Sequence, residues 1–311
     1  MRSKRDVTIV RLWGIAGVVY PHRGLRNFWR RACYVRQAIR VRHLLAQLSE
    51  APPSSPLGRH VTIRPQVLNF VEAPFINARW DAAQRLSAFL RQFEIAQSMG
   101  EVFGFDPDKS VEILTLEWFG PDYLIVMDKP SWFQREGIFT INIFRQNLRL
   151  ISLCFSFDIE NGERIVVIGA VQGRRIDGAL DEYRQLTKLA NGMRPRDFLI
   201  DIVRILGAVM GAQRMIAISD ACRQHRSPYF GRDTKRTLAL DYDEIWRDRG
   251  GVPRSDGFFE LSIDRQVRDI DEIPSKKRQM YRQRYAMMDA IEERIRKTLK
   301  DLKPTIRPEA D

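Results

Sequence analysis

The segment that contains Ser219 and His225 has residue types suited to acid–base chemistry. His225 is the only histidine after residue 60, and an imidazole titrates near neutral pH, so it can act as a general base. Ser219 ends an apolar stretch, residues 214–219, that predicts a strand. Groups just past a strand end often bind ligands in α/β-type sheets. We expect His225 and Ser219 to be catalytic; the alternative is a loop histidine bonded to backbone or water.

A phosphate group is the ligand expected at residues 191–196, which precede a predicted helix at residues 196–210. A helix N-terminus offers unpaired N–H groups and the positive end of the helix dipole. The residues expected to bind a cofactor there are Asn191, Gly192, Arg194 and Arg196, whereas the alternative is an ordinary loop cap. The end of a preceding strand, formed by Val171, Gln172 and Gly173, is expected to complete this site with backbone N–H groups.

Other catalytic signatures are missing from the sequence. The four histidines are dispersed, and no CxxC or HExxH spacing occurs, so no metal site is predicted. There is no GxSxG elbow and no GxGxxG fingerprint. Residues 173–179 begin like a P-loop, but Ala179 and Leu180 stand where lysine and serine or threonine are required.

Positive charge is concentrated near the start of the chain. The 311 residues carry 51 Lys plus Arg and 39 Asp plus Glu, a net charge of +12, and residues 1–50 alone hold eleven basic and two acidic side chains. Residues 25–48 predict a helix with an apolar stripe beside a basic face formed by Arg26, Arg30, Arg36 and Arg40. Either that face is merely solvated, or it contacts phosphates or anionic headgroups.

A second basic cluster, Lys276, Lys277 and Arg278, opens the last predicted helix. Cations at a helix N-terminus oppose the helix dipole, which favours an anionic contact there. Arginine alternates with aromatic residues in two places, but no nucleic-acid-binding motif is present, so nucleic acid is the less favoured partner. A membrane surface or a phosphorylated small molecule is favoured instead.

The remaining bulk features indicate a cytoplasmic protein. With 44% apolar residues the chain can form a sizeable core. No apolar run reaches the length of about 20 residues that spans a bilayer, and Cys33, Cys154 and Cys222 do not resemble a disulfide framework. A peripheral position at the inner membrane is compatible with the basic N-terminal helix.

The sequence predicts an α+β fold in which an antiparallel sheet is flanked by helices. Residues 1–58 form a basic helical extension with a proline-rich linker, residues 59–303 form the α+β domain, and residues 304–311 form a tail. The expected helices cover residues 74–99, 178–190, 196–210, 237–248 and 274–302. The expected strands cover residues 112–119, 123–128, 139–145, 150–158, 164–172, 214–219 and 257–261, with a hairpin turn at residues 160–163.

Several ordered segments together resemble the VirK/YbjX family of bacterial proteins. They are residues 133–137, 169–173, 186–188 followed by 192–196, 218–220 with His225, 241–246 with 250–251, 256–261 and 272–278. The resemblance covers roughly residues 75–295 and implies a role in virulence, envelope-stress tolerance or stress response, without a settled biochemical activity. Asp220 departs from the asparagine expected in many relatives, which weakens a catalytic role for that position.

The order of elements is also similar to that of GNAT acyltransferases, which bind the CoA pyrophosphate at a glycine-containing loop before a helix. An extra helix and the missing Q/R-x-x-G-x-G/A signature are departures from that pattern. One hypothesis is therefore an acyltransferase-like enzyme that takes an acyl-CoA or acyl carrier protein as donor and acts on an envelope-related acceptor. The other is a non-enzymatic stress factor that docks through its basic N-terminal helix. The acyltransferase hypothesis requires that the strands at residues 164–173 and 214–219 are neighbours and splay apart.

Overall fold

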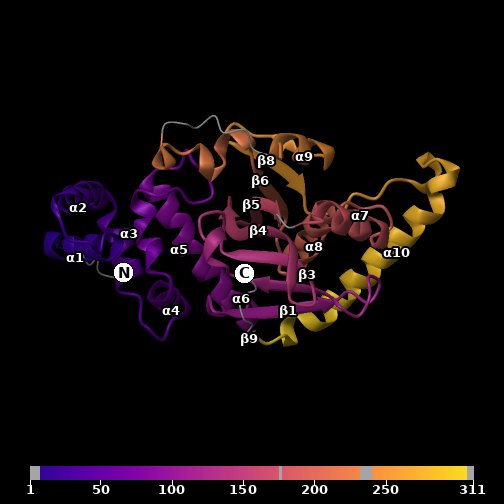
Figure 1. Cartoon of the computed structure of the whole chain (residues 1–311), viewed down its shortest axis with the longest axis horizontal. Helices are drawn as coiled ribbons and strands as arrows, with labels where there is room; N and C mark the ends of the chain where they lie inside the picture. Colours follow the sequence, from indigo (N-terminus) through magenta and orange to yellow (C-terminus); the bar gives the residue numbers. More distant parts are fainter. Residues whose placement is uncertain (1–7, 175–176, 232–239, 307–311) are drawn as a thin grey trace.

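The computed structural model describes residues 8–174, 177–231 and 240–306. Within these residues, one nine-stranded sheet has the order β7-β8-β6-β5-β4-β3-β2-β1-β9. Figure 1 shows the sheet at the centre, helices α1 to α5 at one end, and α10 at the opposite end. The predicted α+β architecture, an antiparallel sheet flanked by helices, is confirmed in this form.

The bounds of the elements are as follows. The helices are α1 (Ile9–Val19), α2 (Leu25–Ala38), α3 (Arg42–Ser49), α4 (Pro56–Ile63), α5 (Ala82–Ser98), α6 (Glu101–Gly104), α7 (Ala179–Leu189), α8 (Pro195–Val209), α9 (Tyr242–Asp248) and α10 (Ser275–Thr298). The strands are β1 (Lys109–Thr115), β2 (Tyr123–Asp128), β3 (Phe139–Arg145), β4 (Leu148–Glu160), β5 (Glu163–Gly173), β6 (Arg214–Ile218), β7 (Val252–Pro253), β8 (Phe258–Ser262) and β9 (Thr305–Ile306).

Strands β1 to β5 form the predicted antiparallel meander. The turn between β4 and β5 contains Asn161 (φ 54°) and Gly162 (φ 83°). Positive φ at both central residues is the geometry that matches the twist of a two-residue hairpin, and Asn-Gly is the pair that adopts it most readily. This local chemistry explains why the hairpin was predictable from the sequence.

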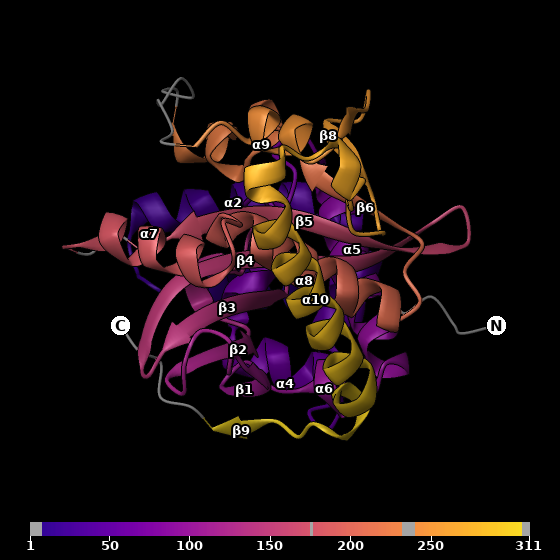
Figure 2. The same cartoon turned by 90° about the vertical axis from the view of Figure 1, so that its right-hand side faces the viewer.

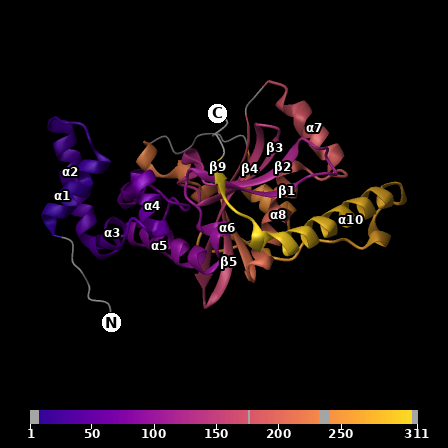
Figure 3. The ribbon, with the colours of Figure 1, turned by 90° about the horizontal axis from the view of Figure 1, so that it is seen from below.

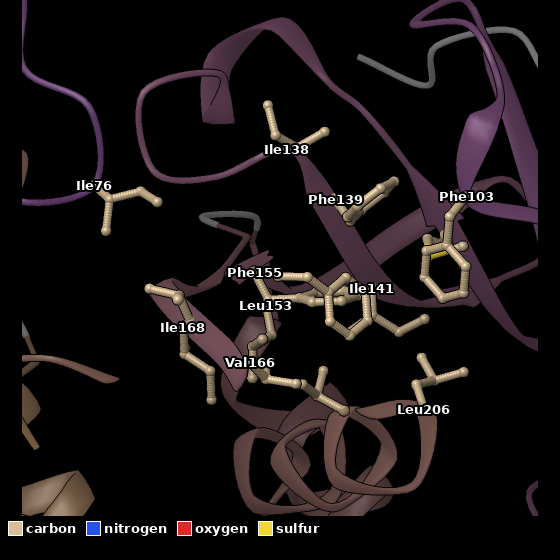
Figure 4. Close-up of a cluster of buried hydrophobic side chains, with 14 of the residues drawn as sticks. Ile76, Phe103, Ile138, Phe139, Ile141, Leu153, Phe155, Val166, Ile168 and Leu206 are labelled. Carbon is tan, nitrogen blue, oxygen red and sulfur yellow. The ribbon is translucent and has the colours of Figure 1, made fainter. Parts of the chain in front are cut away.

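The two faces of the meander differ in the size of their side chains. On one face, Ile141, Leu153, Phe155 and Val166 pack with Leu206 of α8, as Figure 4 shows. On the opposite face the paired residues are small or polar, namely Thr140, Cys154 and Ala170 in one row and Asn142, Ser152 and Gln172 in the next. A face of short side chains leaves room for a loop to pack closely against the strands.

The second part of the sheet begins with a parallel pair. Helices α7 and α8 connect β5 to β6, which pairs parallel to β5 from Ile165 opposite Arg214 to Ile168 opposite Ala217. Strand β8 then pairs antiparallel with β6, and β7 with β8. Connecting parallel strands requires such a helical crossover. The two strands whose adjacency the sequence-based hypothesis required are therefore neighbours.

The N-terminal helices differ from the prediction. Residues 25–48 do not form one helix, because a 3-10 turn at Ile39–Val41 separates α2 from α3, and α1 precedes them. Leu12 and Tyr34 are buried in the same apolar cluster as α5 and the sheet. The division of the chain at residue 58 stays a prediction.

Two further helices are shorter than expected. Helix α5 starts at Ala82, not near residue 74, because Asp81 and Gln84 form a capping box that sets its N-terminus. Helix α10 ends at Thr298, not at residue 302 as predicted. It buries Met287, Met288, Ile291 and Ile295, all in its second half. Figures 2 and 3 show α10 running past α8 and extending away from the sheet. The first part of the predicted helix at residues 237–248 and the end of the predicted tail lie outside the described residues.

Candidate active site

The loop between β2 and β3, residues 129–138, covers the face of short side chains and carries Glu136 to the middle of the sheet. The Ile138 N–H donates to Ser156 Oγ at 3.1 Å, and Phe133 packs with Cys154 and Ala170. Strand β5 has a bulge here, since Cys154 pairs with Ala170 but Phe155 pairs with Ile168. The residue left over is Gly169, where a Cβ would collide with the carbonyl oxygen of Glu136. A glycine is therefore needed for the loop to approach this closely.

The segment after β6 brings Gln224 and His225 to the same place. The Ser219 N–H donates to the Gly257 carbonyl at 3.0 Å, and the Ala78 N–H donates to the Cys222 carbonyl at 2.8 Å. These bonds fix a turn that continues into the 3-10 helix Gln224–Arg226. The loop between β2 and β3 and the segment after β6 thus meet across about ninety residues of sequence.

Glu136 and His225 form the centre of the site. Glu136 is 7% exposed, and its Oε1 lies 3.7 Å from His225 Nε2. Gln224 Nε2 donates to the same oxygen at 3.2 Å. The His225 side chain is 40% exposed, so one partner faces the interior and the other faces solvent. A separation of 3.7 Å is an electrostatic contact that a small rotation converts into a hydrogen bond.

Burial makes the Glu136 carboxyl group a weaker acid than an ordinary glutamate. Removal from water raises its pKa to about 7, while the hydrogen bond from Gln224 and the charges of Arg223 and Arg135 oppose this shift. Its carboxyl group therefore exchanges a proton near neutral pH. The Glu136 carboxyl group is buried and the neighbouring His225 imidazole is accessible to solvent. Such a pair can move a proton to or from a bound molecule.

Arginines and carboxylates surround this pair. Arg223 donates to Asp220 Oδ1 at 3.1 Å, and Arg226 donates to Asp220 Oδ2 at 2.7 Å. Although burial acts in the other direction, these two arginines lower the pKa of Asp220. The side chain of Asp220 is thus held as a carboxylate in an ion pair, which fits a structural role.

Strands β5 and β6 form a fork beside the pair. Their hydrogen bonding ends at Ile168 and Ala217, while β5 continues to Gly173. Helix α9 inserts two aromatic side chains at this point. The Val171 N–H donates to Tyr242 Oη at 2.9 Å, and the Tyr242 hydroxyl donates to the Val171 carbonyl at 2.9 Å. Trp246 Nε1 donates to the Ile218 carbonyl at 2.7 Å.

Val171, Gln172 and Gly173, the residues of β5 expected to bind a cofactor, lie at this fork, but their contacts differ from the prediction. The Val171 N–H, assigned above to an oxyanion, already has a partner in Tyr242. Gly173 packs against the Tyr183 ring, where a Cβ would collide with the hydroxyl group. Gln172 is exposed. A ligand that used the Val171 peptide group would first have to displace Tyr242.

The loop at residues 191–196 lies under α10. Arg284 donates through Nε and an amino nitrogen to the Asn191 carbonyl, at 3.1 and 2.8 Å, and a Cβ at Gly192 would meet the Met280 sulfur at 2.9 Å. The charges of Arg194 and Arg196 face Asp248, at 3.4 and 4.0 Å. The loop does open helix α8, as the sequence predicts, yet its charge is shared with an acidic neighbour.

The basic residues predicted to contact an anionic surface lie at the two ends of the molecule. Arg26, Arg30, Arg36 and Arg40 are all exposed on α2 and the turn after it. Lys276 and Lys277 are exposed on α10, whereas Arg278 donates to the carbonyls of Ile273 and Asp271, both at 2.9 Å. Arg278 thus holds the start of its own helix.

Sequence reasoning did not assign chemistry to Glu136, Gln224 or Tyr242. Glu136 and Tyr242 belong to segments that carried the family resemblance, which was the available signal for them. Their contacts with residues after β6 are long-range, and no local pattern encodes them.

Residues 8–174, 177–231 and 240–306 contain neither a metal-binding cluster nor a membrane-spanning helix. No group of three or more His, Cys, Asp or Glu side chains in them could hold a metal ion. No helix among them is both long and apolar enough to cross a bilayer.

Known proteins provide the remaining comparison. An uncharacterized protein of Haemophilus influenzae is 27% identical over 237 residues, which cover 74% of this chain and 75% of the relative. The uncharacterized protein YbjX of Escherichia coli is 25% identical over 277 residues, 86% of this chain and 83% of that protein. The membrane protein LapB of Mannheimia haemolytica is 22% identical over 223 residues, 66% of this chain and 90% of LapB.

No solved structure matches the chain. The model of the family described as protein of unknown function (DUF535) matches residues 23–297. This range includes the loop with Glu136, the fork between β5 and β6, and His225. With YbjX among its relatives, the chain belongs to the DUF535 family, also called VirK/YbjX, as its sequence segments indicated.

Proposed function

We propose that this protein is an acyltransferase-like enzyme in which His225 is the general base and Glu136 is its partner. The observation that carries the proposal is the contact between Glu136 and His225 beside the fork of β5 and β6. The donor is an acyl-CoA or an acyl carrier protein thioester, and the acceptor is a nucleophile related to the cell envelope.

The sheet topology supports this choice of reaction. A meander, a helical crossover, a parallel neighbour and a final hairpin whose second strand lies beside that neighbour are similar to the order in GNAT acyltransferases. Pairing between β5 and β6 ends at Ile168, beside the bulge at Gly169, and Tyr242 occupies the position beyond it, which is where that fold admits its donor. The similarity is one of topology, and the side chains at the fork supply the chemical argument.

The site residues can be given roles in the transfer. His225 takes the proton from the acceptor hydroxyl or amine as its oxygen or nitrogen attacks the thioester carbonyl carbon. The C–S bond then breaks, and the thiolate leaves and takes up a proton. Glu136 stabilises the imidazolium that forms, because its carboxylate lies 3.7 Å from His225 Nε2. Ser219 directly follows β6 and is buried, with its N–H bonded to the Gly257 carbonyl.

The donor's phosphates fit the start of α8. Arg194 has a side chain that is 58% exposed, and Arg196 lies in the same turn. Binding a pyrophosphate there would require both guanidinium groups to exchange Asp248 for phosphate oxygens, which is favourable because phosphate carries more charge.

Calorimetric titration tests the proposal. The full chain is titrated with acetyl-CoA, a long-chain acyl-CoA and an acyl carrier protein thioester, and we expect one of them to bind. His225→Gln and Glu136→Gln should bind that donor with unchanged affinity but transfer the acyl group at least about 100-fold more slowly. His43→Gln, exposed on α3, is the control. Failure of all three donors to bind would overturn the proposal.

A second function, docking on an anionic membrane surface, is favoured by a separate observation. Leu25 and Phe28, two members of the predicted apolar stripe on α2, are 78% and 53% exposed, and the neighbouring Trp29 is 63% exposed. Arg26 and Arg30 lie beside these residues on the same helix, and both are exposed. Arginines beside exposed aromatic residues on one helix fit an interface of anionic headgroups and acyl chains. One relative carries the printed name membrane protein LapB, which agrees with this surface.

Vesicle co-sedimentation tests the docking function. We expect the chain to bind phosphatidylglycerol vesicles and to bind phosphatidylcholine vesicles at least about tenfold more weakly, with binding falling as salt rises. Arg26→Gln with Arg30→Gln, and separately Trp29→Ser, should each weaken binding. Trp118→Ala, a half-exposed tryptophan elsewhere, is the control. Equal binding to both vesicles, or tighter binding to a DNA duplex, would exclude this function.

A further inference from the structure

A cavity lies on the face of the meander that carries short side chains, apart from the pair Glu136 and His225. It has a volume of about 310 Å³ and is lined by Trp132, Phe133, Arg149, Leu150, Ser152, Gln172, Gly173 and Arg174. Phe133, packed on Cys154 and Ala170, separates it from Glu136. This volume is at the lower end of the range for small-molecule sites.

The floor of the cavity is a buried polar network. Arg149 is 7% exposed and donates to Asp128 Oδ2 at 2.7 Å and to Asn142 Oδ1 at 2.5 Å. Ser152 Oγ donates to the same Asn142 oxygen at 2.6 Å. Such a network costs desolvation free energy and is maintained only if its members satisfy one another. It fixes the positions of Arg149 and Ser152 before any ligand binds.

One wall of the cavity is an aromatic surface. The Arg149 guanidinium lies 5.2 Å from the centre of the Trp132 ring and 4.8 Å from that of Phe144. Trp132 is nevertheless 46% exposed. A large indole ring that is held in place on one side and open on the other is suited to stack on a flat ligand.

The net charge of the cavity comes from Arg174. The charge of Arg149 is balanced by Asp128, whereas Arg174 forms no ion pair with the residues that the structure describes. Its backbone is fixed at the rim, because the Arg174 N–H donates to the Leu150 carbonyl at 3.0 Å and the Tyr183 hydroxyl donates to the Arg174 carbonyl at 3.0 Å. The Arg174 side chain is therefore attached to a backbone position that two hydrogen bonds hold in place.

From this combination we infer that the cavity binds a flat organic anion, with its ring on Trp132 and its negative group on Arg174. The exposed amide of Gln172 and the hydroxyl of Ser152 can bond to polar substituents of the ring. The site does not depend on the acyl-transfer proposal, since its lining includes neither Glu136 nor His225.

Titration calorimetry with model compounds tests the inference. The probes are 2-naphthoate, 2-naphthyl phosphate, 2-naphthol and cyclohexanecarboxylate. We expect the two aromatic anions to bind at least about tenfold more tightly than the neutral naphthol and the non-aromatic carboxylate. The tighter of the two anions then identifies the negative group as carboxylate or phosphate.

Variants locate the binding. Trp132→Leu, which keeps apolar volume but removes the indole, and Arg174→Gln should each weaken 2-naphthoate binding about tenfold. Trp118→Leu, 38% exposed beneath Arg294, and Arg184→Gln, exposed on α7, should leave it unchanged. The inference is overturned if no anion binds, if naphthol binds as tightly as naphthoate, or if the Trp132 and Arg174 variants bind with wild-type affinity.

Discussion

Glu136→Gln removes one ionisable group from the interior and leaves the size of the side chain almost unchanged. The amide oxygen of the new residue can still accept the hydrogen bond from Gln224 Nε2, which is 3.2 Å long in the wild type. The variant therefore differs from the wild type mainly in its inability to carry a charge. Any change in stability that depends on pH can be attributed to the ionisation of Glu136.

The sign and size of that change follow from linkage. Burial raises the pKa of Glu136 from its usual 4.5 to about 7, so the folded protein binds this proton more tightly than the unfolded chain does. The wild type therefore loses stability as the pH rises from about 4.5 to about 7, and this loss persists above 7. The full shift corresponds to about 3 kcal/mol. The free energy of unfolding of Glu136→Gln, relative to the wild type, should rise by about 2 to 3 kcal/mol from pH 5 to pH 8.

Urea unfolding of both proteins at pH 5, 6, 7 and 8 measures this difference, and other titrating groups cancel in the comparison. Glu94→Gln, at an exposed position on α5, serves as the control for loss of a surface carboxylate. A difference in the free energy of unfolding between Glu136→Gln and wild type that stays constant from pH 5 to pH 8 would refute the assignment of a buried Glu136 that titrates near neutral pH.

Two further substitutions test the packing around the site, and a third tests a buried ion pair on α8. Gly169→Ala should lower the free energy of unfolding by about 2 kcal/mol or more, because the new methyl group meets the Glu136 carbonyl; urea stability equal to wild type would contradict the close approach. Tyr242→Phe should cost about 1 to 3 kcal/mol in thermal or urea unfolding, since it leaves the Val171 N–H and carbonyl unpaired, and no loss would show that water replaces the hydroxyl. Arg204→Met should lower the free energy of urea unfolding by about 1 to 3 kcal/mol, because it removes one buried partner of Asp201, at 2.7 Å, while Arg249 remains at 2.5 Å; Arg184→Gln, which breaks an exposed ion pair with Asp181, should cost almost nothing.

The sheet was largely predictable because its signals are local. Short runs rich in Ile, Val, Phe and Leu, separated by turn residues, predict the five strands of the meander, and Asn161-Gly162 predicts its clearest hairpin turn. Helix α8 was likewise predictable from Pro195 at its start. These features depend on residues that are close in sequence.

The burial of the N-terminal helices was not predictable in the same way. The predicted stripe of apolar residues has helical spacing and consists of Leu25, Phe28, Ala32, Val35 and Ile39. Of these, Val35 is buried and Ala32 is half-buried, whereas Leu25, Phe28 and Ile39 are exposed. A hydrophobic stripe shows which face is apolar, but not whether another element covers it. The exposed members of the stripe support the docking function.

The site was predictable in part. The placement of His225 after β6 follows from the sequence, since the strand end is a local feature and His225 is the only histidine after residue 60. The role of Glu136 does not, because its raised pKa is caused by burial where its own loop packs on the sheet and meets the segment after β6. The fork at Val171 was expected to be open, whereas Tyr242, 71 residues away, occupies it.

Turnover of the donor thioester tests the central claim, that Glu136 and His225 act together as an acid–base unit, most directly. Release of free thiol from the donor that binds is measured from pH 5 to pH 9 for the wild type, His225→Gln and Glu136→Gln. The account predicts a wild-type rate that changes through a group titrating near pH 7, and a loss of at least about 100-fold in both variants. Wild-type rates in either variant, or no thiol released from any donor by the wild type, would contradict it.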